Sequence, residues 1–330
     1  MSKKICKAGH PGVAVVLSVY NGDDFLREAV QSILDQTFTD FEFIIIDDAS
    51  TDTTPDILAE YAEKDARVRV LRNDVNRERS VSRNRAMYES RAELIAIMDA
   101  DDVSSPDRLE KQYAFMMNNP DVTVCGTHIN CLESKKIHDY PVDDKGIRAR
   151  MLFASSIAHP SVMFRKNTVL GIGGYLPDMV PAEDYDLWNR LSTVNGARFA
   201  NIPEPLLMYR GNNTAKSPSS LQRQIAAAKK VQKAALARLG VICTDADVET
   251  HWIAAGYEPS ITRNQLRLAK AWLLDILNAN KTTGVYDQNA LLAEVLYRHA
   301  LISEYSYNYA RNPGSMRSRI KRRVKDWIKT

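Results

Sequence analysis

Short apolar runs alternate with amphipathic segments through the first third of the chain. Four of these runs predict strands, at residues 13–20, 41–47, 67–71 and 94–98. The first two are almost wholly apolar, which is typical of strands that are buried on both faces. The segments between the strands have the periodicity of helices, at residues 24–36, 55–64 and 80–90. Strands that alternate with helices of this length predict right-handed crossovers and a doubly wound, mostly parallel α/β sheet.

The alternation loosens after residue 98. Three more strands are predicted at residues 122–125, 161–164 and 197–202, and a helix at residues 183–194. Beyond them the pattern predicts helices alone, at residues 221–239, 262–277, 289–307 and 315–329. A polar stretch of Ser, Pro and Asn at residues 213–220 indicates a boundary. We therefore expect an N-terminal tail (1–10), an α/β domain (11–214) and a helical C-terminal region (215–330).

Composition indicates a globular protein of the reducing cytosol. Of 330 residues, 45% are hydrophobic and 26% are charged, which leaves ample material for a core. The four cysteines form no CxxC pair and have no histidine at zinc spacing, so neither a disulfide framework nor a structural metal is indicated. No signal peptide and no apolar run of about 18 residues is recognisable, so a membrane-spanning helix is not expected.

The positive charge is concentrated at the C-terminal end. Residues 311–330 hold eight Lys or Arg and one Asp, although the whole chain carries only +3. In residues 315–329, apolar side chains including Trp327 recur at three- and four-residue spacings between the basic residues. This pattern predicts a helix that lies on an anionic membrane surface through residues 315–330, and the alternative is a last helix that packs on the domain. Nucleic acid is not expected as a partner, because aromatic interleaving is absent and the rest of the chain is mildly acidic.

Three carboxylates follow the fourth predicted strand directly, as Asp99, Asp101 and Asp102. Charges packed this closely repel one another unless a cation or a set of donors balances them. A hard divalent cation that shares its oxygen ligands with substrate phosphates would do so, which points to Mg2+ or Mn2+. The alternative is a solvated turn with Ser105 as the N-cap of the next helix.

Polar clusters also follow the first two strands, at residues 18–22 (SVYNG) and 47–52 (DDASTD). Ligands of an open parallel sheet bind outside the carboxyl ends of its strands, so these clusters and the acidic turn predict one site. Neither a G-x-G-x-x-G fingerprint nor a G-x-x-x-x-G-K-[ST] loop is present. The pattern therefore favours base and ribose recognition by carboxylates, with a cation bridging to phosphate.

Five motifs together resemble the family 2 inverting glycosyltransferases of the GT-A fold, of the bacterial surface-polysaccharide type. They span residues 11–212 in the order known from that family: VVLSVYN at 15–21, DDxSxD at 47–52, SRN at 82–84, DADD at 99–102 and EDYDLW at 183–188. The resemblance implies a GT-A nucleotide-sugar domain at residues 11–214, with the helical remainder as an extension.

The resemblance also implies a role for individual residues in binding the donor. Asp48 would accept a hydrogen bond from uracil, Ser18 and Tyr20 would form the wall around the base, and Asp99 would hold the ribose hydroxyls. Asp101 would bind the metal ion, Mn2+ or Mg2+, that bridges to the diphosphate. Asn21, Arg83 and Ala100 complete the implied nucleotide-sugar site. Two alternatives stay open: Tyr20 as a core residue at the sheet edge, and Arg83 as a brace for the acidic turn instead of a phosphate ligand.

The pair Glu183-Asp184 carries the catalytic base in the family. Asp184 precedes Leu187, Trp188 and Leu191 at helical spacing, in the first turn of the predicted helix, where the helix dipole favours the ionised carboxylate that a base needs. We therefore expect Asp184 as the base, with Glu183 as the second choice and helix capping as the alternative role. The family often has a histidine shortly after a Tyr-Arg pair, but Tyr209-Arg210 is followed by Gly211, so a weak metal site is expected.

These features predict a metal-dependent inverting transferase, a hexosyltransferase or N-acetylhexosaminyltransferase. Its donor would be a nucleotide sugar, most simply UDP-linked, and its acceptor a hydroxyl of a lipid-linked glycan. The enzyme would be cytoplasmic and peripheral at the inner face of the cell membrane. One rival is a sugar nucleotidyltransferase, which normally needs a glycine- and lysine-rich loop after the first strand. The other is a catalytically silent membrane adaptor with the same fold, which a turnover assay would distinguish.

Overall fold

The computed structural model describes residues 10–132, 134–211, 218–258 and 261–308. The chain divides into two compact units. The first comprises Met1–Val142 and Ile157–Gln224, and the second comprises Asp143–Ser156 and Ile225–Thr330. The second unit thus includes a short segment from the middle of the chain, which the sequence pattern does not indicate.

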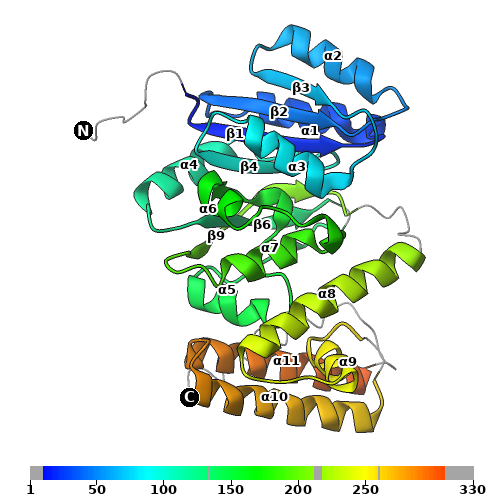
Figure 1. Ribbon diagram of the computed structural model, residues 1–330, viewed down its shortest axis with the longest axis vertical. Helices are drawn as coiled ribbons and strands as arrows, with labels where there is room; N and C mark the ends of the chain where they lie inside the picture. Colours follow the sequence, from blue (N-terminus) through cyan, green and yellow to red (C-terminus); the bar gives the residue numbers. More distant parts are fainter. Residues whose placement is uncertain (1–9, 133, 212–217, 259–260, 309–330) are drawn as a thin grey trace. The chain divides into compact units, whose positions relative to one another are not determined.

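A nine-stranded sheet forms the core of the first unit, in the order β3-β2-β1-β4-β8-β6-β9-β5, with β7 paired to β6 (Figure 1). Its strands are β1 (Val13–Val19), β2 (Phe41–Asp47), β3 (Val68–Arg72), β4 (Leu94–Asp99), β5 (Val103–Ser104), β6 (Val124–Cys131), β7 (Ile137–His138), β8 (Met163–Arg165) and β9 (Phe199–Tyr209). The half formed by β3, β2, β1 and β4 is entirely parallel. In the other half, β8 runs antiparallel to β4 and β6, while β6 and β9 are parallel.

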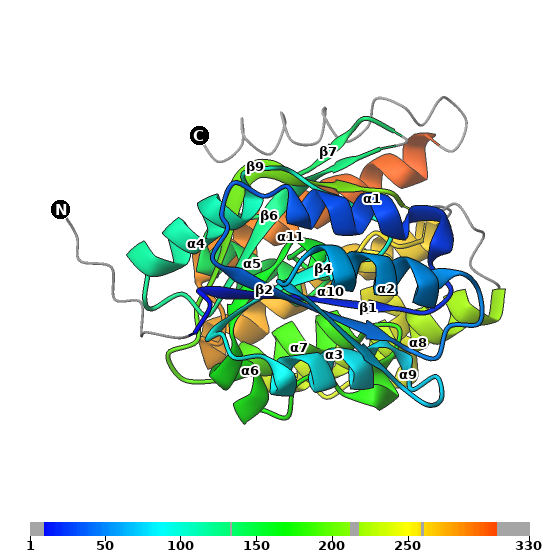
Figure 2. The same cartoon turned by 90° about the horizontal axis from the view of Figure 1, so that it is seen from above.

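Helices cover both faces of this sheet. Figure 2 shows α1 (Asp23–Leu34) on one side of β1 and β2, and α3 (Glu78–Glu89) with α6 (Lys166–Gly171) and α7 (Glu183–Leu191) on the other. The remaining helices of this unit are α2 (Thr54–Lys64), α4 (Arg108–Asn118) and the short 3-10 turns His159–Ser161 and Pro177–Met179. Because β1 is covered on both sides, all five residues from Val13 to Leu17 are fully buried, which accounts for the unbroken apolar run in the sequence.

The second unit is helical within its described residues. It contains α5 (Asp144–Met151), most of α8 (Pro218–Arg238), α9 (Asp245–Ala254), α10 (Arg263–Thr283) and α11 (Gln288–Asn308). Leu236, Leu273, Leu291 and Ile302 are among the buried side chains of its core. Capping boxes begin α9 at Thr244 and α10 at Thr262, where the hydroxyl of each cap accepts the amide of the third helical residue.

The doubly wound α/β fold with a helical C-terminal extension is confirmed. The first four strands and the three helices between them lie where the pattern predicts them, within about two residues. Two predicted strands were too short, because β6 and β9 continue to residues 131 and 209. Helices α5, α6 and α9 were missed, and the predicted helix at residues 315–329 lies outside the described residues. None of the helices in the described part of the chain is long and apolar enough to cross a membrane.

Candidate active site

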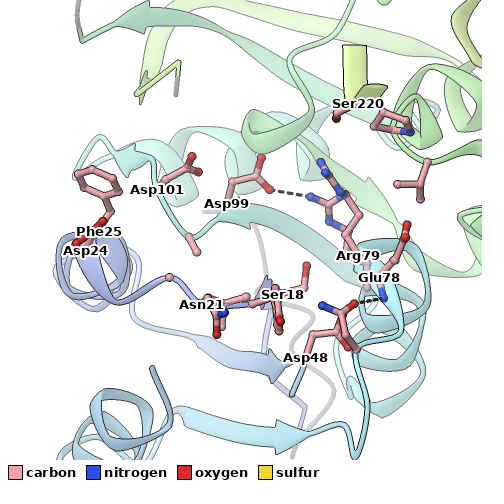
Figure 3. A pocket seen from close by; sticks show the side chains of 18 of the residues that line it. Ser18, Asn21, Asp24, Phe25, Asp48, Glu78, Arg79, Asp99, Asp101 and Ser220 are labelled. Atoms are coloured by element: carbon pink, nitrogen blue, oxygen red, sulfur yellow. Dashed lines mark hydrogen bonds and ion pairs between the residues drawn. The ribbon is translucent and has the colours of Figure 1, made fainter. Parts of the chain in front are cut away.

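A cavity of about 860 Å3 opens at the carboxyl ends of β1 and β4, and all of its lining residues belong to the first unit (Figure 3). Eight of the ten predicted site residues line it: Ser18, Tyr20, Asn21, Asp48, Arg83, Asp99, Ala100 and Asp101. Glu183 and Asp184 do not line it, but Glu183 is ion-paired with Arg83, which does. The structure therefore joins motifs that are far apart in the sequence, since Arg83 and Glu183 are 100 residues apart.

The register of the parallel strands brings these side chains together. In the sheet, Ser18 of β1 lies opposite Asp99 of β4, and Val19 lies opposite Asp47 of β2. The amide of Asp48 donates to the carbonyl of Val19 over 2.8 Å, which extends the pairing beyond the last strand residues. The polar ends of the three strands thus meet at one edge of the sheet, as expected for this class of fold.

The loops after β1 and β2 are tied to each other through Asn21. Its backbone is in the left-handed region, with φ of 50°, which asparagine adopts more readily than most residues. Its amide donates to Oγ of Ser50 over 3.0 Å, and its side-chain oxygen accepts the amide of Thr51 over 2.8 Å. Asn21 therefore shapes the cavity wall, and one of its side-chain atoms is already engaged.

Asp48 is a buried residue in the cavity wall, and two donors from the loop between β3 and α3 hold its carboxylate. Nδ2 of Asn73 donates to its Oδ1 over 2.6 Å, and the amide of Arg77 donates to the same oxygen over 3.0 Å. The adjacent Asp47 instead accepts from the amide of Ser50 (2.9 Å) and from Arg72 (2.6 Å), and so it braces the loop after β2. Tyr20 is 50% exposed, so the alternative of a core residue at the sheet edge is wrong.

The acidic turn between β4 and β5 concentrates negative charge. Burial and the neighbouring charge of Asp99 raise the pKa of Asp101 above its ordinary value. The same two causes raise the pKa of the buried Asp102 to about 8. Oδ1 of Asp102 accepts the amide of Arg210 over 2.9 Å, but its buried Oδ2 has no partner among the described residues.

This concentration of carboxylates, with one buried oxygen of Asp102 left without a partner among the described residues, fits a divalent cation at Asp101. No three His, Cys, Asp or Glu side chains come together as a ready-made metal site in the part of the chain that the structure describes. A cation at this turn would therefore take most of its ligands from phosphate oxygens and water, as Mg2+ and Mn2+ do with nucleotide substrates.

Arg83 connects the acidic turn to the other predicted carboxylates. Its side chain is 5% exposed, and its two terminal nitrogens bind Asp99 over 2.8 Å and Glu183 over 2.9 Å. Burial of Asp99 opposes its ionisation, but the charge of Arg83 outweighs this and holds the pKa of Asp99 below its usual range. Of the two roles considered for Arg83, the structure shows the bracing of the acidic turn.

Glu183 and Asp184 begin α7. Glu183 is buried, and its Oε1 faces both Arg83 and, at 3.6 Å, Arg79; its Oε2 has no partner among the described residues. Burial, followed by the negative charge of Glu183, raises the pKa of Asp184 to about 6, and the first-turn amides of Asp184 and Tyr185 oppose this shift. A carboxylate with a pKa near 6 is ionised at neutral pH and still basic enough to accept a proton.

His159 is part of the packing and not of the cavity lining. Its Nε2 lies 2.9 Å from the hydroxyl of Tyr175, and its ring contacts Trp188. Burial and the charge of Arg83 hold the pKa of His159 well below its ordinary value, so the ring is neutral. His159 is therefore a structural residue whose hydrogen bond is made within the protein.

Several lining residues were missed. Glu78 and Arg79 come from the start of α3, and Ser220 and Arg223 from the start of α8. Residues 76–79 follow β3, and the same rule about strand ends that indicated the other clusters would have found them. By contrast, α8 begins beyond the sheet, and no pattern in its sequence indicates that it reaches the cavity.

Sequence comparisons show the family of the chain. Residues 14–161 match the profile of Glycosyl transferase family 2, and residues 94–230 match that of Glycosyl transferase family group 2. An uncharacterized glycosyltransferase of Methanocaldococcus jannaschii is 35% identical over 223 residues, which are 65% of this chain and 76% of the relative. The O-antigen biosynthesis glycosyltransferase WbnJ of Escherichia coli is 36% identical over 217 residues, 63% of this chain and 83% of WbnJ. The chain belongs to glycosyltransferase family 2.

Solved structures show the family's GT-A fold for this chain. S. aureus TarS 1-349 in complex with UDP-GlcNAc aligns with a TM-score of 0.58 at 16% identity, covering 89% of each chain. The mannosyltransferase PcManGT of Pyrobaculum calidifontis, in complex with GDP-Man and Mn2+, aligns with a TM-score of 0.53 at 17% identity, covering 88% of each chain. As a member of family 2, the protein is a glycosyltransferase that uses a nucleotide-sugar donor. This membership favours a transferase over the rival sugar nucleotidyltransferase.

Proposed function

We propose that the protein is a metal-dependent inverting glycosyltransferase that moves a hexose or N-acetylhexosamine from a UDP-sugar to a hydroxyl of a glycan. One observation carries this proposal. The unbroken chain Asp99–Arg83–Glu183, with ion pairs of 2.8 and 2.9 Å, joins the acidic turn to the helix turn that holds Asp184. The proposed donor site and a base of suitable pKa are therefore connected by one set of ion pairs.

The donor fits the carboxyl edge of the sheet. Asp48, held by Asn73 and Arg77 through Oδ1, accepts the ring N–H of uracil, and the exposed ring of Tyr20 lies against the base. Asp99 accepts the ribose hydroxyls, with Ser18 opposite it in the register. Asp101 would hold Mn2+ or Mg2+, which would neutralise charge on the departing diphosphate. The UDP of TarS and the Mn2+ of PcManGT support this assignment by analogy of fold.

Transfer needs one base and one leaving group. The ionised carboxylate of Asp184 accepts the proton of the acceptor hydroxyl, and the acceptor oxygen attacks the anomeric carbon on the face opposite the diphosphate. The new C–O bond forms as the bond to the phosphate oxygen breaks, and its electron pair leaves with UDP. The anomeric configuration is inverted, and no covalent enzyme intermediate is formed.

The acceptor is a glycan of a surface polysaccharide. Relatives named for O-antigen biosynthesis, such as WbnJ, support this class. A lipid-linked acceptor and a peripheral position at the cytoplasmic face of the membrane rest on the basic pattern of residues 315–330, which lie outside the described part of the chain.

The test is UDP release by the purified protein with Mn2+, against a panel of UDP-sugars, with and without lipid-linked acceptors. We expect slow hydrolysis of one donor, with a loss of at least about 100-fold in Asp101→Ala, because the leaving group loses its counter-charge. Asp184→Asn should abolish acceptor-dependent turnover but leave UDP binding intact. Absence of nucleotide binding and of turnover in the wild type would favour the silent adaptor.

A further inference from the structure

Glu78 has a backbone conformation that glutamate rarely adopts. It is the first residue of α3, and its φ is 62°, in the left-handed region. Three other described residues apart from glycine have positive φ: Asn21, Ala49 and Lys135. Asn21 is stabilised by its own hydrogen bonds with Ser50 and Thr51. Glu78 has no such local compensation, since only its amide is engaged, with Oδ1 of Asn76 at 3.0 Å.

The side chain of Glu78 is available to a ligand. It is exposed and lines the cavity, and its carboxylate makes no hydrogen bond or ion pair with any other residue that the structure describes. Figure 3 shows it in the cavity wall that also includes Asp48 and Arg79. Non-glycine residues in the left-handed region concentrate at active and ligand-binding sites, where the function of the side chain offsets the cost of the backbone strain.

Its neighbours place Glu78 between the two ends of the donor site. The amide of Arg77 donates to Asp48 over 3.0 Å, at the end proposed for the base. Nε of Arg79 lies 3.6 Å from Oε1 of Glu183, at the end proposed for the reaction. A ligand that extends along the cavity from Asp48 toward Arg79 would therefore lie beside Glu78, which lines the same wall.

We propose that Glu78 is a specificity residue for the donor, whose carboxylate accepts hydrogen bonds from hydroxyl groups of the nucleotide sugar. These hydroxyls belong either to the ribose or to the transferred sugar, and the chemistry is the same for both. The inference rests on the proposed function, because it takes the donor to be a nucleotide sugar in this cavity.

The experiment compares the wild type with Glu78→Gly, Glu78→Gln and Lys135→Gly. Each protein is titrated calorimetrically, with Mn2+ present, with UDP, UDP-glucose, UDP-galactose and UDP-GlcNAc, and its melting temperature is recorded. Glycine removes the backbone strain in both glycine variants, so neither should melt below the wild type. We expect Glu78→Gly to bind the preferred UDP-sugar about tenfold more weakly, since hydrogen bonds to a charged group are lost. Lys135 also has a positive φ but does not line the cavity, so Lys135→Gly should bind the preferred UDP-sugar like the wild type.

The remaining outcomes show which hydroxyl groups Glu78 binds, and they distinguish a failure of this inference from a failure of the proposed function. An equal loss of affinity for UDP and for the UDP-sugar assigns the contact to the ribose, and a loss for the UDP-sugar alone assigns it to the transferred sugar. Glu78→Gln preserves shape and removes charge, so it should show a smaller loss than glycine. If both Glu78 variants bind within twofold of the wild type, the inference is overturned while the proposed function stands. If the wild type binds none of the four probes, the proposed donor class fails, and the inference fails with it.

Discussion

Asp184 and Glu183 are adjacent in the sequence, yet the structure gives them different surroundings. Glu183 is buried against Arg83, whereas Asp184 is only half-buried and has the charge of Glu183 beside it. The two carboxylates of the motif therefore differ in kind: Glu183 is held by Arg83, and its charge, after burial, raises the pKa of Asp184.

This division predicts a shifted pH profile for Glu183→Gln. Asp184 must be ionised to act as a base, so kcat/KM should fall as the pH drops through about 6. Burial and then Glu183 raise the pKa of Asp184, and Arg83 lowers it. Removal of Glu183 deletes a charge that raises the pKa and leaves Arg83 less neutralised, so both changes act downward. The acidic limb of kcat/KM should move to lower pH by about one unit.

The measurement is the pH dependence of kcat/KM, since the position of the limb reports the pKa and is independent of the maximal rate. Glu89→Gln is the matched control, because Glu89 also forms an ion pair with an arginine of the first unit, Arg69, but is 48% exposed. An unchanged acidic limb in Glu183→Gln would contradict the electrostatic role of Glu183.

At this scale the sequence indicated most of the predicted residues that line the cavity, but not their partners. Ser18, Asp48, Asp99 and Asp101 follow strands that the hydrophobic pattern predicts, and the parallel register then places them at one edge. The pairing of Arg83 with Glu183 spans 100 residues, and it depends on the packing of α3 against the start of α7. No local pattern in one sequence specifies such a contact.

Among the elements, the end of β9 is what holds the acidic turn in place. The amide of Arg210 donates to Asp102 over 2.9 Å, and its Nε donates to the carbonyl of Asp101 over 2.8 Å. The guanidinium also lies over the ring of Phe25, 4.3 Å from its centroid, and pairs with Glu28 of α1. Arg210 thus anchors the backbone of the proposed metal ligand to a helix on one face of the sheet.

We therefore expect Arg210→Ala to weaken the binding of Mn2+ in the presence of UDP by about tenfold, because Asp101 loses the donor that fixes its carbonyl. The backbone bond to Asp102 survives in this variant, so the fold should persist. Mn2+ affinity is measured by electron paramagnetic resonance titration. Arg198→Ala removes an exposed ion pair with Asp121 near the other end of β9 and serves as the control. Equal Mn2+ affinity in the two variants would refute the anchoring role.

The strands that the sequence failed to predict in full, β5, β7 and β9, were missed for a common physical reason. β5 and β7 contain two residues each and are strands only because β9 and β6 pair with them. β9 includes the exposed segment Pro203–Pro205 between buried residues, which interrupts the apolar pattern that a strand would show. Long-range pairing decides these elements, and local propensity does not.

For the molecule as a whole, the two units have separate hydrophobic cores. Every residue that lines the cavity belongs to the first unit. Beside its apolar core, the second unit contains a largely buried ion cluster, in which Glu294 binds Arg298 over 2.7 Å and Arg150 over 3.2 Å. Arg150 lies in the segment Asp143–Ser156, so this cluster explains in part why that segment belongs with the C-terminal helices. The domain boundary near residue 214, read from the sequence, stays a prediction.

This separation predicts that Glu294→Gln destabilises the protein without changing its affinity for the donor. Burial opposes the ionisation of Glu294, but Arg150 and Arg298 hold its pKa below the ordinary value, so the carboxylate is charged at neutral pH. Its loss leaves two arginines without a counter-charge in a largely buried site, which should cost about 3 kcal/mol of unfolding free energy. Glu249→Gln is the control; Glu249 pairs with Lys229 but is 61% exposed, so its loss should cost below about 1 kcal/mol.

Urea unfolding gives the stability, and UDP titration at a temperature below the onset of melting gives the affinity. Equal stability of the Glu294→Gln and Glu249→Gln variants would show that the buried cluster contributes no more than a surface pair. A loss of UDP affinity in folded Glu294→Gln protein would show that the helical unit takes part in donor binding. The lining of the cavity argues for the opposite result: a less stable enzyme whose donor site is unchanged, because the residues that form this site all come from the α/β unit.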